Sequence, residues 1–255
     1  MKRSLDKESI KSTSFYIVGL LAIIAIWIVS SIVINNDIVL PKFINVMKSL
    51  KDLFLDGNTY LTIGNTLLKL ILSVAFGFVI SFILGLLSYL FEGFSYFITP
   101  LIAILRTLPV ASVSILLLLL IGNRQTPYFI TLFVLIPVLY ENILMSLKGI
   151  NKGVIEEVKM MSNLTPYVLF NIYIPIIGPG LISGLISSIG LGLKVMVMAE
   201  FISQTPNTIG YELNQEKIFL NIDRVFAWTI VLIIFMIVVT YILKIVQKKA
   251  KINEA

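Results

Sequence analysis

The chain has 255 residues, of which 58% are hydrophobic and 13% are charged. A soluble domain averages about 45–50% apolar and about 25% charged residues, so this chain has too few polar residues to cover a globule in water. Cysteine and histidine are absent, which excludes disulfides, a thiol nucleophile and the commonest general base and metal ligand. The net charge of +6 fits a membrane protein with basic cytoplasmic loops better than a nucleic-acid-binding protein.

Long apolar runs recur along the chain between polar segments. Residues 15–34 contain no charge and match the roughly 20 residues that a membrane span requires. A cleaved signal peptide would have a shorter apolar core. Further apolar runs cover approximately residues 62–91, 95–121, 127–147, 173–202 and 225–246. The sequence therefore predicts an all-α, polytopic membrane protein with six transmembrane helices, between tails at residues 1–14 and 247–255.

The connecting segments indicate how the helices are oriented. Between the first two spans, apolar residues from Phe43 to Phe54 recur at helical spacing, which predicts an amphipathic helix on the membrane surface. Lysines and arginines are more frequent in the two tails and around residues 148–159 than in the opposite loops. Because basic residues accumulate on the cytoplasmic side, both termini are predicted to be cytoplasmic.

The loop at residues 148–172 is the longest one predicted in the cytoplasm. Residues 154–161 predict a short helix that is apolar on part of its surface, with Glu156 and Glu157 keeping it in water. Thr165 and Pro166 predict the start of a second helix, with Thr as N-cap and Pro at the first helical position. These residues alone fit either a docking segment or an interfacial connector without a partner.

The loop resembles the EAA motif of ABC-importer permeases that work with a substrate-binding protein. Glu156 fills the acidic position, Glu157 and Val158 replace the two alanines, and Ser162 replaces the glycine. Pro175 follows thirteen residues later, as in the family. Four further stretches resemble the sulfonate/nitrate/taurine branch of these permeases, namely LPKFINVMKSLKDLF, LRTLPVASV, KVMVMAE and IGYELNQEKIFLNIDRVFAWTIV.

The resemblance implies the type I ABC-importer permease fold, with the loop at 148–172 as a coupling loop. It implies a homodimer in the cell membrane, two ATP-binding subunits and an extracytoplasmic binding protein that delivers a small solute. The residues implied in docking the ATPase are Glu156, Glu157, Val158, Met161, Ser162 and Pro175. No GxxxxGK[ST] phosphate loop is present, so the chain is expected to bind no cofactor and not to be an enzyme, with ATP-Mg on the partner.

Several alternatives stay open from the sequence. The solute could be a sulfonate, taurine, nitrate, or a precursor of thiamine or riboflavin, and the second permease could be a paralogue. A stand-alone secondary transporter or channel is the alternative function. Carriers usually contain internal repeats with broken helices, and no clear repeat relates residues 15–125 to 126–246.

Ionisable residues within the predicted spans are candidates for function. Lys69 is expected to snorkel to the outer interface. Arg106 either lies at the membrane edge or faces the translocation path. Glu141 is expected to form a structural ion pair with Arg106 or Lys194, and Glu200 is expected to be solvated near the outer end.

Small residues recur every four positions in the fifth apolar run, at Gly180, Gly184, Ser188 and Gly192. This spacing lets helices approach closely. The small face either packs within the subunit or lines the dimer axis and the path. The candidate path residues are Arg106, Gly184, Ser188, Lys194 and Met198.

Overall fold

The computed structural model describes residues 2–161 and 165–252, and every regular element in them is a helix. Within these described ranges, four helices are long and apolar enough to cross a membrane: Gly57–Leu90, Thr126–Lys148, Leu169–Ser203 and Ile222–Ile242. A fifth is added if two consecutive helices that are bent by 97° count as one span. The predicted first span lies within α1 (Lys2–Ile34), whose described apolar part, Leu21–Ile34, is shorter. The predicted all-α membrane class is confirmed.

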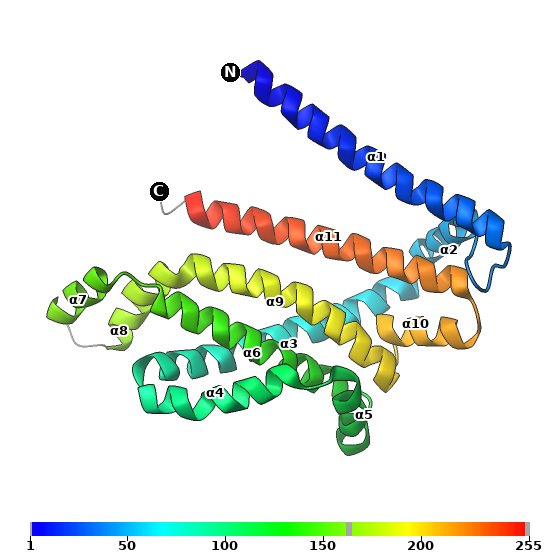
Figure 1. Ribbon diagram of the computed structural model, residues 1–255. Helices are drawn as coiled ribbons and strands as arrows, with labels where there is room; N and C mark the ends of the chain where they lie inside the picture. Colours follow the sequence, from blue (N-terminus) through cyan, green and yellow to red (C-terminus); the bar gives the residue numbers. More distant parts are fainter. Residues whose placement is uncertain (1, 162–164, 253–255) are drawn as a thin grey trace. The chain divides into compact units, whose positions relative to one another are not determined.

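Contacts divide the chain into two compact units (Figure 1). The first comprises residues 1–57 and 215–231, and the second comprises residues 58–214 and 232–255. Each unit therefore holds together segments that are far apart in the sequence.

The first unit joins the end of α1, the amphipathic helix α2 (Phe43–Leu55) and the start of α11 (Ile222–Ile252). The Trp27 indole donates a hydrogen bond to the carbonyl of Pro41, at 3.1 Å. The Trp27 ring packs on Phe43 and Phe226, with centroid separations of 5.6 and 5.2 Å. The Ser49 hydroxyl also donates to the Asp223 carboxylate. The predicted amphipathic helix is thus present, with Val46, Ser49 and Leu53 buried and Phe43 at its start in the aromatic cluster.

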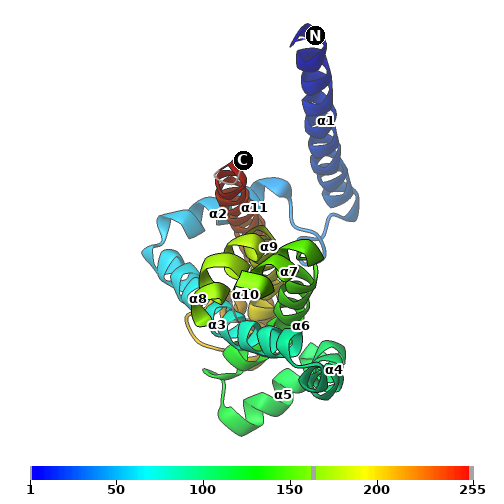
Figure 2. The ribbon, with the colours of Figure 1, turned by 90° about the vertical axis from the view of Figure 1, so that its left-hand side faces the viewer.

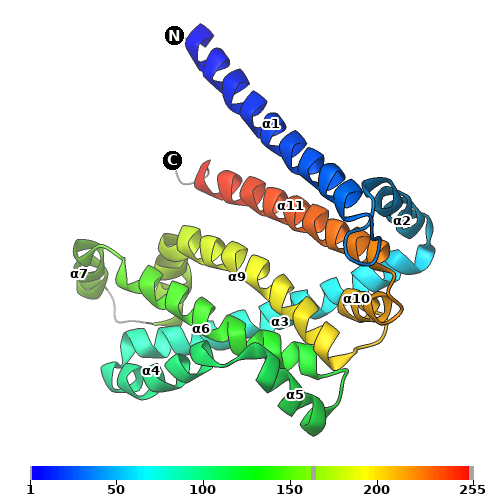
Figure 3. The ribbon, with the colours of Figure 1, turned by 45° about the vertical axis from the view of Figure 1, so that its right-hand side comes forward.

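The second unit is built around α6 (Thr126–Lys148) and α9 (Ile174–Ser203), which lie side by side in Figures 1 and 3. A Cβ added at Gly184 would lie 2.9 Å from the Cβ of Asn142 on α6. One added at Gly192 would lie 3.0 Å from Leu70 of α3 (Gly57–Leu90). The small residues of α9 therefore bring these helices close together, as the packing interpretation predicts.

The third apolar run forms two helices, α4 (Glu92–Thr107) and α5 (Val110–Ile121), bent by 97° (Figure 3). Pro109 lacks the backbone N–H that would continue the helix, and it forces Leu108 out of the helical region. Leu108 accordingly has φ −61° and ψ 125°. The run is a broken segment rather than a straight span because of this one dipeptide.

The predicted coupling loop contains two helices, as expected. The first is α7 (Lys152–Met161), and the second, α8 (Pro166–Val168), continues through the π-helix η1 (Leu169–Tyr173) into α9. The Val168 N–H donates to the hydroxyl of Thr165 at 3.3 Å, which confirms Thr165 as the N-cap. Figure 2 views this end of the second unit, with α7 and α8 beside the first turns of α9. The second helix of the loop is therefore an extension of α9.

Several boundaries differ from those predicted. Helix α3 begins at Gly57 instead of residue 62, and α11 runs to Ile252. Helix α1 begins at Lys2, so the polar residues assigned to a tail continue the same helix. The helix α10 (Ile209–Ile218) was not predicted, because its residues show no apolar periodicity. It begins after Thr208, whose hydroxyl accepts a hydrogen bond from the N–H of Tyr211 at 3.4 Å.

Candidate functional site

A fully buried carboxylate, Glu200, lies in the last turn of α9. Its side chain is 0% exposed, and Oε2 accepts hydrogen bonds from the Thr66 hydroxyl at 3.0 Å and the Gly210 N–H at 3.3 Å. Oε1 has no hydrogen-bond donor among the described residues, and the Lys69 ammonium lies 3.9 Å from it. Burying a carboxylate is costly unless it is paired and hydrogen-bonded, so Lys69 supplies the compensating charge.

This pair corrects two predictions. Glu200 is buried rather than solvated, and the Lys69 side chain is only 13% exposed rather than snorkelling freely. Side chains in a helix lean toward its N-terminus, so the Lys69 side chain reaches back toward the end of α9. The sequence gives no signal for the pair, because its members are separated by 131 positions and lie on different helices.

The turn after α9 is fixed in place by hydrogen bonds to two other elements. The Thr205 hydroxyl donates to the carbonyl of Asn123 at 2.7 Å, and the Asn65 amide of α3 donates to the carbonyl of Asn207 at 3.0 Å. Gln204 and Asn207 both have positive φ, 49° and 57°, a conformation that Asn tolerates better than most residues. The ends of α3, α6 and α9 are therefore held together.

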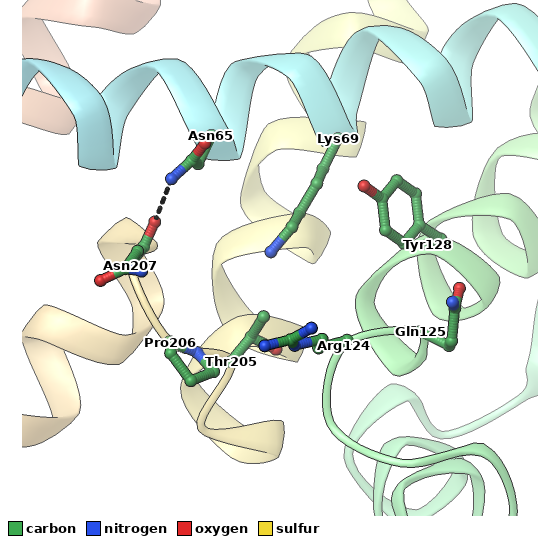
Figure 4. A pocket seen from close by; sticks show the side chains of 8 residues that line it. All are labelled: Asn65, Lys69, Arg124, Gln125, Tyr128, Thr205, Pro206 and Asn207. Carbon is green, nitrogen blue, oxygen red and sulfur yellow. Dashed lines mark hydrogen bonds between the residues drawn. The ribbon is translucent and has the colours of Figure 1, made fainter.

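A pocket of about 350 Å³ opens between these three helix ends. Figure 4 shows the Lys69 ammonium pointing from α3 toward the Arg124 guanidinium, with Tyr128 and Gln125 on the α6 side and the 205–207 turn opposite. None of the eight residues that line the pocket is acidic. Arg124 and Gln125 are exposed, so the pocket is accessible from the surface.

Arg106 lies in the last turn of α4, directly before the bend. Its guanidinium is 2.6 Å from the Glu141 carboxylate of α6, which confirms the predicted ion pair and selects Arg106 over Lys194 as the partner. The two side chains are 64% and 40% exposed on this single chain. Charges within membrane spans face protein or water rather than lipid, so the pair marks a surface of α4 and α6 that lipid does not cover.

The other predicted path residues lie in different environments. Gly184 and Ser188 are buried, and the Ser188 hydroxyl donates back to the carbonyl of Gly184 at 2.8 Å. Both residues therefore pack within the subunit. Lys194 and Met198, by contrast, are exposed on α9. A role in lining the path therefore stays a prediction for Lys194, Met198 and Arg106.

The coupling helix α7 has two different faces. Glu156 and Glu157 are exposed, and Met160 is 80% exposed. Val158 is half-buried and lines a small internal space with Ile172 and other apolar residues of α7, η1 and α9. Among the described side chains, the outward face thus combines Glu156 and Glu157 with Lys152 and the apolar Met160, while the inward face holds the helix on the rest of the unit.

The predicted docking residues fall on both faces. Glu156, Glu157 and Pro175 are exposed, whereas Val158 faces the chain itself. Met161 ends α7, and its side chain lies outside the described part, as does the whole of Ser162. Met160 is not among the predicted docking residues, although its spacing from Glu156 and Glu157 places it on the same helical face.

Comparisons with known proteins agree with this architecture. The family described as "Binding-protein-dependent transport system inner membrane component" matches residues 77–252. A protein of Bacillus subtilis (strain 168) named as an aliphatic sulfonates transport permease, SsuC, is 26% identical over 216 residues, covering 82% of this chain and 76% of the relative.

Solved structures share the fold. Two inward-facing structures of the MetNI methionine ABC transporter superpose with TM-scores of 0.67 and 0.64 at 16% and 15% identity. They cover 74% and 72% of this chain and 94% and 92% of the matched chains. The family match favours the importer permease over the stand-alone carrier or channel. The chain belongs to the family of binding-protein-dependent transport system inner membrane components and is a multi-pass permease of an ABC importer.

Proposed function

We propose that this chain forms, with a second copy of itself, the translocation path of an importer for small organic anions, with sulfonates as the first candidates. Two ATP-binding subunits, carrying ATP-Mg, dock on the cytoplasmic coupling loop, and an extracytoplasmic binding protein delivers the solute. In this arrangement both termini of the chain are cytoplasmic. The 26% identity to a permease named for aliphatic sulfonates supports the solute class.

The observation that carries the proposal is the shape of α7. A separate amphipathic helix presents the carboxylates of Glu156 and Glu157 outward, and its inward face contacts η1 and α9. A helix that lies in a groove of a partner transmits the partner's movement as a rigid body. Because α8, η1 and α9 follow one another without a break, movement of α7 reaches a membrane-spanning helix directly.

The test is co-expression of the permease with a candidate ATP-binding subunit of an ABC importer, followed by co-purification of the two. Reversing both charges, Glu156→Lys with Glu157→Lys, removes both carboxylates and is expected to abolish co-purification. Met160→Ala is expected to weaken it, because an exposed apolar side chain that fills a partner pocket contributes about 1–3 kcal/mol.

The matched control is Glu92→Lys at the start of α4, an exposed acidic residue on the same predicted side of the membrane. This variant should retain the ATPase, and all variants should elute as monodisperse proteins in gel filtration. Retention of the ATPase by the doubly reversed variant would refute docking through α7. Loss of the ATPase from the Glu92→Lys control would show that any reversal of surface charge suffices, and would equally refute it.

A further inference from the structure

The pocket between the ends of α3, α6 and α9 contains two positive charges and one buried negative charge. Lys69 is compensated by Glu200, at 3.9 Å. The described residues give Arg124 no carboxylate within ion-pair distance, and the Lys69 ammonium points toward its guanidinium (Figure 4). The accessible part of the pocket is therefore cationic.

The Glu200 carboxylate is not accessible to a ligand in the pocket. It is 0% exposed and directs Oε2 at Thr66 and Gly210, so its charge is used within the protein. Its role is to hold the Lys69 ammonium beside Arg124 in spite of their repulsion. Two cations kept together without an exposed counter-charge are a common arrangement for recognising an oxyanion, because each N–H···O bond is then charge-assisted.

The neutral residues around the two cations suit the same ligand. Asn65, Gln125 and Tyr128 line the pocket, and their amide and hydroxyl groups can donate hydrogen bonds. The volume of about 350 Å³ lies at the lower end of the range for small-molecule sites, about 300–1,000 Å³. The pocket would hold a small anion with a short organic substituent rather than a large cofactor.

We propose that Lys69 and Arg124 form a binding site for a sulfonate-type oxyanion at the end of the permease where the solute enters. The proposal rests on the function proposed above, because the predicted topology places this end outside the cytoplasm and the relative suggests the anion. It deepens that function by giving the permease a solute site of its own, where an anion released by the binding protein would first be held.

The experiment measures binding to the full-length permease in nanodiscs of phosphatidylcholine. Ethanesulfonate is the probe, uncharged diethyl sulfone is its neutral counterpart, and saturation-transfer NMR titration gives the Kd. Ethanesulfonate is expected to bind and the sulfone is not. Arg124→Gln should raise the Kd about tenfold or more, because a charge-assisted hydrogen bond is lost. Arg124→Lys keeps the charge and should recover part of the affinity.

The control variant is Lys48→Gln, which removes an exposed cation of α2 on the same predicted side of the membrane. It should leave the Kd within about twofold, since isolated surface charges contribute little. Unchanged binding in Arg124→Gln would overturn the proposal, and so would equal binding of the neutral sulfone. The lipid headgroup is tested by adding phosphatidylglycerol to the nanodiscs: unchanged sulfonate binding supports a solute site, and its abolition assigns the pocket to anionic lipid and overturns the proposal.

The failure of this proposal can be told from failure of the proposed function. If the permease retains its ATPase and transports its solute while Arg124→Gln has no effect on binding, only the pocket assignment is wrong. If the ATPase does not dock on α7, the importer assembly is wrong whether or not ethanesulfonate binds.

Discussion

The pair Lys69–Glu200 makes a prediction in which a second substitution repairs the first. Lys69→Met leaves the fully buried Glu200 carboxylate with two hydrogen bonds and no positive charge. Removing one partner of a buried ion pair costs about 3–5 kcal/mol, because the remaining charge is uncompensated. We expect Lys69→Met to lower the free energy of unfolding by an amount in this range.

Glu200→Gln is expected to cost less, about 1–3 kcal/mol. The amide oxygen can still accept the hydrogen bonds from Thr66 and Gly210. The unpaired Lys69 ammonium is also better placed than the carboxylate, because its side chain is 13% exposed and opens on the polar pocket. The loss of stability in Glu200→Gln is therefore smaller, because the Lys69 ammonium that remains unpaired is already partly solvated.

The double variant Lys69→Met, Glu200→Gln removes both charges and should therefore be more stable than Lys69→Met alone. Buried ion pairs are often replaced by neutral residues at little cost, so we expect the double variant to regain about 2 kcal/mol. Free energies of unfolding would come from SDS titration of the permease in mixed micelles, followed by circular dichroism. The control is Glu157→Gln on the exposed face of α7, which should change stability by less than about 0.5 kcal/mol.

Additive costs in this cycle would refute the reasoning. If the double variant is as unstable as the sum of the single variants, the two side chains act independently and Lys69 does not compensate Glu200. If Lys69→Met is as stable as wild type, the carboxylate is neutral or hydrated in the folded protein, which is equally inconsistent with the proposed pair.

Three further predictions concern packing and the exposed ion pair. Gly184→Val should lower the free energy of unfolding by about 1–3 kcal/mol, because the larger side chain overpacks against α6. The control is Gly64→Ala, whose added Cβ has no atom within 4 Å. In the same SDS titration, this variant should leave the free energy of unfolding unchanged or raise it by up to about 1 kcal/mol. Gly210→Ala should lower the free energy of unfolding by about 3 kcal/mol, because the added Cβ would lie 2.5 Å from backbone atoms of α9. A smaller loss of stability than in Gly184→Val would contradict this prediction. Arg106→Glu and Glu141→Arg should each reduce solute uptake by the reconstituted importer. The double variant that exchanges the two charges should recover part of the uptake. If the double variant takes up no more solute than the single variants, the pair does not matter for transport.

Local chemistry in the sequence predicted the elements that depend on it. Thr165 and Pro166 predicted the start of α8, where the Thr165 hydroxyl accepts a hydrogen bond from the N–H of Val168. An ion pair of Glu141 with Arg106 or Lys194 was predicted because a charge in apolar surroundings needs a partner, and the structure selects Arg106. Such signals are carried by a residue and its chain neighbours, so they can be read without the fold.

The polar pocket could not be predicted in this way. Its residues come from three segments centred near positions 67, 125 and 206, and only the packing of α3, α6 and α9 brings them together. Glu200 looked like a solvated residue at a helix end, because burial by α10 depends on a helix with no apolar periodicity. The glycine at position 210 reflects this close contact, because any side chain there would meet the backbone of α9. The reason for that glycine is visible only in the structure.

The unbroken helix from Leu169 to Ser203 has a consequence for regulation. Its 35 residues span about 50 Å at 1.5 Å per residue. The coupling segment begins at one end of this helix, and the turn that closes the cationic pocket follows the other. If the two ends share one rigid element, their ligands are thermodynamically linked: the factor by which nucleotide-driven docking alters anion affinity must equal the factor by which the anion alters docking. Solute supply would then be sensed by the ATPase through α9 itself.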